Sequence, residues 1–159
     1  QLREISRKTG ISPTSVKIYL NKLSKESRPG FPLVIKSKHR IYGYPVYSAN
    51  RESELFRLYK KIDTIITIQE SDLLNYLWET CMPDVIILFG SASRGEDVKD
   101  SDIDIFLQCK GIELDLRKFE KILNRKISLF FASDFNNLSK ELKNNILNGV
   151  ILNGYIKVF

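Results

Sequence analysis

Residues 85–108 read VIILFGSASRGEDVKDSDIDIFLQ, and this stretch decides the fold of the part of the chain that contains it. Its first five residues, Val85 to Phe89, are apolar and rich in β-branched side chains, which is typical of a buried strand. Gly90 and Ser91 turn the chain into a short helix, and a polar loop follows. From Asp102 to Gln108 the residues alternate with period two, so a second strand is predicted, with Ile103, Ile105 and Leu107 on one face.

The same alternation places two carboxylates, Asp102 and Asp104, on one face of that strand, about 6 to 7 Å apart along the chain. Such a pair can share a divalent cation, and Mg²⁺, or Mn²⁺ in its place, is bound by one or two carboxylates together with phosphate oxygens. Gly90 allows backbone to approach a phosphate closely, and the Ser91 hydroxyl can donate to it. The alternative is a surface turn followed by an edge strand with two solvated aspartates.

This pattern resembles the signature of the minimal nucleotidyltransferases of the DNA polymerase β-like superfamily, which is Gly-Ser, a second Gly, and Ser-Asp-x-Asp. The resemblance extends from about residue 70 to the end and implies a nucleoside triphosphate substrate, with ATP the first candidate. It also implies that Asp102 and Asp104 are the catalytic residues and metal ligands. The nucleotide-binding residues that it implies are Gly90, Ser91, Arg94 and Ser101.

One position departs from the family pattern. A third carboxylate is expected on the strand that corresponds to Lys126–Phe131, where it helps to bind the metal and accepts the proton of the attacking hydroxyl, but the alignment puts Ser128 there. A serine hydroxyl is neither a base nor a negative charge, and loss of a general base typically costs about 10² to 10⁴ in rate. Asp134, Asp100 and Glu96 are the carboxylates that could substitute for it.

Composition limits the remaining possibilities. The 159 residues carry a net charge of +6, but residues 1–61 hold 14 Lys+Arg and 4 Asp+Glu (net +10), whereas residues 62–159 hold 11 and 15 (net −4). A basic N-terminal part suggests a polyanionic partner. No window approaches the roughly 18 to 20 apolar residues of a membrane span, and no signal peptide is visible. With one histidine and two isolated cysteines, zinc and histidine-centred catalysis are improbable, and reduced thiols in a cytoplasmic protein are expected.

The N-terminal sequence resembles a winged helix-turn-helix. A helix from Leu2 to Lys8 is followed by a turn and by a second helix that Ser12 caps and Pro13 begins. A basic hairpin follows, with strands Phe31–Lys36 and Ile41–Tyr47. This resemblance implies binding to double-stranded DNA and a further helix upstream of Gln1; a solvated hairpin or a protein-pairing module is the alternative. The expected DNA contacts are Thr14, Lys17, Asn21, Lys36, Lys38 and Arg40.

The expected fold class is α+β, with a winged helix-turn-helix at residues 1–50, a linking helix at 51–69 and a small α/β nucleotidyltransferase domain with a mixed β-sheet at 70–159. Asn50 is the expected cap of the linking helix, and its apolar stripe is Leu55, Leu58, Tyr59, Ile62 and Ile66. Helices are predicted at 72–80, 114–123 and 138–147, with Leu73, Leu74, Leu77 and Trp78 facing inward in the first. Asn153-Gly154 predicts a terminal hairpin.

Two functions remain open at this point. The first is an enzyme that transfers a nucleotidyl group to a hydroxyl acceptor; by resemblance, small transferases of this kind often modify a partner toxin. The second is a degenerate transferase fold that senses a nucleotide or binds a partner, while the N-terminal part anchors a transcriptional regulator to DNA. The other expected partner is a second copy of the chain in a homodimer.

Overall fold

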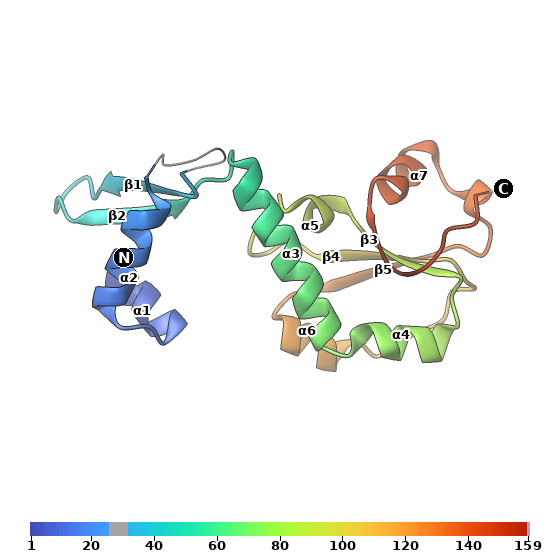
Figure 1. Ribbon diagram of the computed structural model, residues 1–159. Coiled ribbons are helices and arrows are strands. Elements are labelled where there is room, and N and C mark those ends of the chain that lie inside the picture. Colours follow the sequence, from blue (N-terminus) through green and yellow to red (C-terminus); the bar gives the residue numbers. More distant parts are fainter. Residues whose placement is uncertain (26–31, 159) are drawn as a thin grey trace. The chain divides into compact units, whose positions relative to one another are not determined.

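A computed structural model describes residues 1–25 and 32–158 of the chain (Figure 1). The chain divides into two compact units, Gln1–Leu58 and Tyr59–Phe159, called here the N-terminal and C-terminal units. Among the described residues no helix combines the length and the apolar character needed to cross a lipid bilayer.

The N-terminal unit contains two helices, α1 (Leu2–Thr9) and α2 (Pro13–Leu23), and an antiparallel pair of strands, β1 (Val34–Lys38) and β2 (Pro45–Ala49). The cap of α2 is as predicted, because the Ser12 hydroxyl accepts a hydrogen bond from the Ser15 amide at 3.2 Å. Val16 and Leu20 are the buried side chains of this helix.

The hairpin lies later in the chain than its sequence suggested. The predicted strands were Phe31–Lys36 and Ile41–Tyr47; Phe31 lies outside the described residues, and the strands begin at Val34 and Pro45. The reason is the turn between them: the His39 amide donates to the Tyr44 carbonyl at 2.8 Å, and Nδ1 of His39 accepts from two further amides. Residues 39–44 therefore form the tip, so that Lys36 and Lys38 lie on β1.

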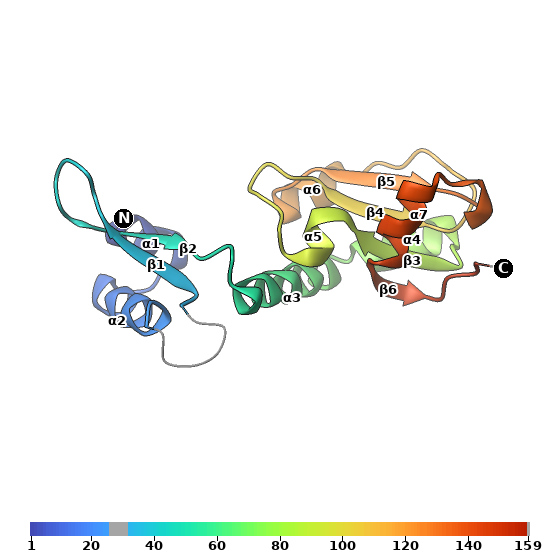
Figure 2. The same ribbon diagram turned by 90° about the horizontal axis from the view of Figure 1, so that it is seen from above.

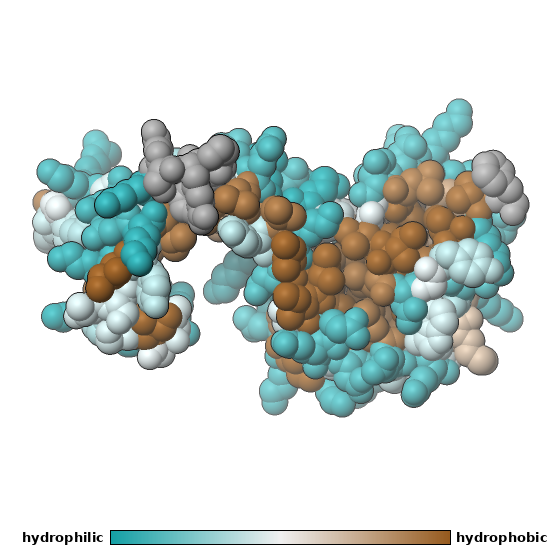
Figure 3. Space-filling view, in the orientation of Figure 1, coloured by the Kyte–Doolittle hydropathy of each residue, from teal (hydrophilic) through white to brown (hydrophobic). Residues whose placement is uncertain are grey.

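Helix α3 (Glu54–Glu70) is continuous through the β-branched run that follows Asp63. Asn50 was predicted to cap it, but the Asn50 side chain donates to the Pro32 carbonyl at 2.7 Å, and the Ser53 hydroxyl accepts from the Phe56 amide instead. The predicted stripe is also largely exposed, and Figure 3 shows apolar surface along α3. The exposed members are Leu58, Tyr59, Ile62 and Ile66, whereas Thr64 and Ile68 are buried.

The C-terminal unit is built on a four-stranded sheet in the order β5-β4-β3-β6. The strands are β3 (Val85–Phe89), β4 (Ile103–Leu107), β5 (Ile127–Phe131) and β6 (Val150–Gly154). Because β4 and β5 are parallel while β3 is antiparallel to both β4 and β6, the sheet is mixed, as predicted. All five side chains of β3 are buried, which places this strand at the centre of the core.

Helices cover both faces of this sheet. The first face meets α3, α4 (Leu73–Cys81) and α6 (Arg117–Leu123), and it includes Ile103, Ile105 and Leu107 as predicted. The other face meets α7 (Lys140–Leu147) and the 3₁₀ turn Phe135–Asn137, and α5 (Gly90–Arg94) follows β3 (Figure 2). One inward assignment was wrong: Trp78 of α4 is 37% exposed.

Three predicted boundaries also change. Helix α6 begins at Arg117, and α7 begins at Lys140, after its cap Ser139. Asn153-Gly154 does not form a hairpin turn. Strand β6 ends at Gly154, whose φ is 77°, and a Cβ there would lie 2.2 Å from the Asp84 carbonyl oxygen. The glycine therefore allows the backbone at residue 154 to lie close to the backbone at Asp84. The Tyr155 amide donates to the Asp84 carbonyl at 3.1 Å.

Candidate active site

The sheet register brings the predicted site residues together at one end of the C-terminal unit. Asp104 of β4 lies opposite Phe89, the last residue of β3, on one side and opposite Ser128 of β5 on the other. Gly90 follows Phe89 directly. The Gly-Ser turn after β3, the aspartates of β4 and Ser128 of β5 therefore meet around a single carboxylate, that of Asp104.

The contact between Gly90 and Asp104 requires a glycine. Gly90 has φ 70°, in the left-handed region, and a Cβ built on it would lie 2.4 Å from Oδ2 of Asp104. Any larger side chain would displace the carboxylate or the turn. The Gly-Ser pair of the motif thus sets how closely the chain passes over the acidic strand.

Ser128 stands beside the acidic pair. Its hydroxyl donates a hydrogen bond to Oδ2 of Asp102 at 3.0 Å, and in the register it faces Asp104. Two carboxylates that were named as substitutes for the third have other partners: an Asp134 oxygen accepts from the Asn136 amide at 2.8 Å, and Glu96 pairs with Arg94 at 2.7 Å. A hydroxyl, rather than a third carboxylate, completes the group on this face.

The electrostatics of the site act on Asp104. Burial raises the pKa of Asp104 above the ordinary value, and the negative charge of Asp102 raises it further, while the positive charge of Arg125 lowers it. Protons therefore compete for Asp104 more strongly than for a solvated aspartate. A cation that neutralises the pair would remove the repulsion between the two carboxylates.

Arg125 is a central residue that the sequence analysis missed. Its guanidinium donates to the Ser101 carbonyl at 2.9 Å, to the Asp102 carbonyl at 3.0 Å and to Oδ2 of Asp97 at 2.9 Å. It therefore fixes the backbone that enters β4 at Asp102, the first aspartate of the motif. Nothing in the local sequence indicates this role, because Arg125 lies more than 20 residues after the loop that it holds.

Asp97, the partner of Arg125, is 3% exposed. Its second oxygen, Oδ1, lies 2.9 Å from Nζ of Lys60 on α3, so the buried carboxylate is held between two cations. A buried carboxylate is tolerated only when such partners compensate for its lost hydration. In the sequence Asp97 is one residue of a polar loop, and the structure shows that it anchors that loop.

The other predicted nucleotide-binding residues have hydrogen-bond partners away from the two aspartates. The Arg94 guanidinium pairs with Glu96, and the Ser101 hydroxyl accepts from the Val98 amide at 2.9 Å, which closes the loop. Ser91 lies at the second position of α5, where its carbonyl accepts from the Glu96 amide at 3.0 Å.

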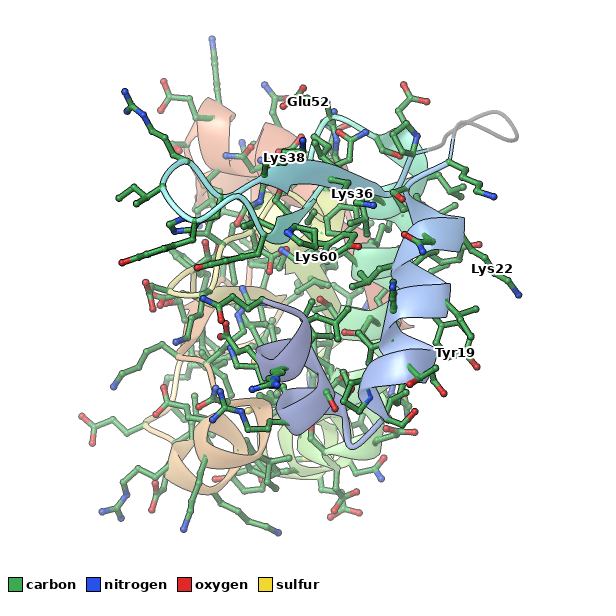
Figure 4. The ribbon with its side chains drawn as sticks, turned by 90° about the vertical axis from the view of Figure 1, so that its left-hand side faces the viewer. Tyr19, Lys22, Lys36, Lys38, Glu52 and Lys60 are labelled. Carbon is green, nitrogen blue, oxygen red and sulfur yellow. The ribbon has the colours of Figure 1, made fainter. Side chains whose placement is uncertain are left out.

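The predicted DNA contacts all lie on the N-terminal unit. Thr14, Lys17 and Asn21 are on α2, where the first two are exposed. Lys36 and Lys38 are exposed on β1 (Figure 4). Arg40 is exposed in the turn that follows this strand.

The acidic pair fits a metal ion only in part. Within residues 1–25 and 32–158 there is no group of three or more His, Cys, Asp or Glu side chains that could hold a metal ion. Two carboxylates and a neighbouring hydroxyl are hard oxygen donors, and Mg²⁺ is commonly bound by one or two carboxylates with the rest of its shell supplied by water and substrate phosphates. The residues therefore suit a cation that arrives with a phosphate ligand.

Comparison with known proteins identifies the C-terminal unit. A family model described as "Polymerase beta, Nucleotidyltransferase" matches residues 72–155, more than half of the chain. No curated protein and no solved structure matches.

We predict that Gly90→Ala destabilises the C-terminal unit by about 1 to 2 kcal/mol, because a left-handed residue with a Cβ costs roughly that much, and that it displaces the Asp104 carboxylate. Urea unfolding followed by the fluorescence of Trp78, the single tryptophan, measures this. The control is Gly111→Ala, whose Cβ would make ordinary contact with Phe131 at 3.5 Å and should change stability by no more than about 0.5 kcal/mol. Equal losses in the two variants would contradict the tight contact at Gly90.

Proposed function

This chain belongs to the polymerase β nucleotidyltransferase family, and we propose that it binds a nucleoside triphosphate with Mg²⁺ and transfers the nucleotidyl group to a hydroxyl acceptor. The observation that supports the proposal most strongly is the meeting of Gly90, Asp102 and Asp104 at one end of the sheet. These residues are the proposed phosphate-approach and cation-binding elements of the family motif, with Ser91, Arg94 and Ser101 as further proposed contacts. ATP is the first nucleotide to test.

In the proposed reaction the acceptor oxygen attacks the α-phosphorus, a new O–P bond forms, and the bond to pyrophosphate breaks. Pyrophosphate leaves with the electron pair, and the acceptor's proton passes to a base. Bound Mg²⁺ would neutralise charge on the phosphates. The chain's own residues would orient the substrate: Asp102 and Asp104 hold the cation, Gly90 leaves room for the phosphates, and Arg125 keeps Asp102 in place through its backbone carbonyl.

We predict that replacing Asp102 and Asp104 together by Asn abolishes Mg²⁺-dependent nucleotide binding, because the amides preserve shape but remove the charge that holds the cation. Isothermal titration calorimetry with ATP, at fixed excess Mg²⁺, measures the affinity. Asp63→Asn, an exposed site on α3, removes one charge away from the motif and should leave the affinity unchanged. Equal affinity in the double variant and the wild type would refute the assignment of the site.

Ser128 supports a second candidate function. A hydroxyl supplies neither the charge nor the basicity of the third carboxylate, which favours a fold that binds nucleotide without rapid transfer. In that case the chain is a nucleotide-sensing or partner-binding transcriptional regulator. The two candidates differ in what a carboxylate at this position would do.

We predict that Ser128→Asp raises nucleotidyl transfer by on the order of 10² or more, because a positioned general base is usually worth that much. Transfer of labelled nucleotide to acceptors in a lysate measures the rate, with Ser128→Ala as the control that removes the hydroxyl without adding a base. If wild-type protein already transfers at a rate that Ser128→Asp does not improve, another group acts as base. If the variant loses stability and gains no activity, the second function is favoured.

For the N-terminal unit we propose a winged helix-turn-helix that binds double-stranded DNA. Its sequence of helix, turn, helix and hairpin supports this, as does its charge, since residues 1–58 hold 12 Lys+Arg and 4 Asp+Glu, a net charge of +8. Figure 4 shows Tyr19 and Lys22 projecting from α2, and Lys36 and Lys38 on β1. Helix α2 would enter the major groove and the hairpin would contact phosphates.

We predict that changing Lys36, Lys38 and Arg40 together to Ala flattens the slope of log affinity against log salt by up to roughly two to three units, since each lost phosphate contact removes about 0.9. Fluorescence anisotropy with labelled duplex DNA over a salt series measures the slope. Changing Lys110, Lys118 and Lys121, which are exposed on the C-terminal unit, removes the same charge and should leave the slope unchanged. An unchanged slope in the hairpin variant would show that these side chains do not contact phosphate.

The acceptor is proposed to be a hydroxyl on a partner protein, with a toxin partner as the specific case, and a homodimer is the proposed assembly. These proposals rest on the family resemblance. Capture of a labelled acceptor from the lysate assay above would identify the partner.

A further inference from the structure

We propose that the ring of Phe130 is the surface on which the base of the bound nucleotide stacks. This inference rests on the proposed function of the acidic site and assigns it a base-binding residue. The ligand would be a nucleotide, in which a flat aromatic base is attached through the sugar to a phosphate chain that binds the metal ion.

The position of Phe130 follows from the sheet. Phe130 is two residues after Ser128 on β5, so both side chains lie on the same face, about 6 to 7 Å apart along the strand. In the register Phe130 pairs with Phe106, and Ser128 pairs with Asp104. Phe130 is therefore the next side chain along the face that carries the acidic pair.

The ring is held in place by a buried neighbour. The centroids of Phe130 and Phe89 are 5.2 Å apart with an interplanar angle of 74°, an edge-to-face contact. Phe89 is 5% exposed and is the β3 residue that pairs with Asp104. Because Phe89 pairs with Asp104 and Phe130 pairs with Phe106, the two rings meet across β4, beside the position of the carboxylate.

Phe130 is nevertheless 38% exposed, whereas Phe106 and Phe135 on the same face are almost fully buried. A phenyl ring that is fixed on one side and open to solvent on the other offers a flat apolar surface without a large entropic cost of ordering. Phe130 lies two residues along β5 from Ser128, which faces the acidic pair. This spacing suits a ligand whose charged end lies at the carboxylates and whose ring lies further along the sheet.

A phenyl ring has no hydrogen-bonding group, so it can hold a base only through its π face. Stacking of this kind accepts every base and is worth roughly 1–3 kcal/mol per base on alanine substitution, which corresponds to about a 5- to 150-fold change in affinity. We therefore expect weak base discrimination at Phe130, with purines, whose rings are larger, bound more tightly than pyrimidines.

The test compares a ligand that has a base with one that does not. Full-length wild type and Phe130→Ala are titrated with ATP and with inorganic tripolyphosphate, both with excess Mg²⁺, by isothermal titration calorimetry. The expected result is a loss of ATP affinity of about 5- to 150-fold with unchanged tripolyphosphate affinity. Phe130→Trp, which keeps a stacking surface, should retain ATP affinity, and Ile122→Ala, an exposed apolar site on α6, should change neither ligand.

The remaining outcomes separate this inference from the proposed function. If wild type binds both ligands and Phe130→Ala changes neither affinity, stacking at Phe130 is refuted while the phosphate site stands. Equal losses for both ligands would also refute stacking, since the substitution would then act on the phosphate site. If wild type binds neither ligand, the proposed function itself fails, and this inference fails with it.

Discussion

The absence of a side chain at Gly90 is the constraint on which the site depends. A Cβ would come within 2.4 Å of Oδ2 of Asp104 and would displace that carboxylate, and the left-handed φ of 70° also favours glycine. Gly90 directly follows the buried strand β3, and the antiparallel pairing of β3 with β4 places Asp104 opposite Phe89, next to Gly90. The position of the Asp104 carboxylate therefore depends on how the buried strand β3 is placed in the sheet.

A second set of contacts, between charges, holds the other half of the site. Arg125 joins the strand entry at Asp102 to the buried carboxylate of Asp97, and Lys60 neutralises the other side of that carboxylate. Because Asp97 and Asp102 flank one loop, the pairing leaves that loop little freedom to move. The positive charge of Arg125 also opposes the rise in the pKa of Asp104 that burial and Asp102 cause.

The sequence predicted the sheet's central strands and the acidic pair, because a buried apolar run and a period-two alternation are local patterns. Alignment to the family pattern predicted Ser128 on the face of the acidic pair, and the parallel register of β5 with β4 places it opposite Asp104. The sequence did not indicate Arg125 or Asp97, whose pairing joins residues 28 positions apart. The prediction of a terminal hairpin was wrong for the same kind of reason. The glycine at position 154 is required by the close approach of the Asp84 carbonyl, which is distant in the chain, and not by a turn between neighbouring residues.

The central place of β3 has a consequence for synthesis on the ribosome. Val85–Phe89 is uncharged, fully buried when folded and paired on both edges, but β6, which covers one of those edges, is made more than 60 residues later. Until then the nascent chain offers an apolar strand with an open edge, the kind of segment that pairs with other chains. A chain shortened before Val150 would lack β6, so this edge of β3 would stay open although none of the proposed site residues had been removed.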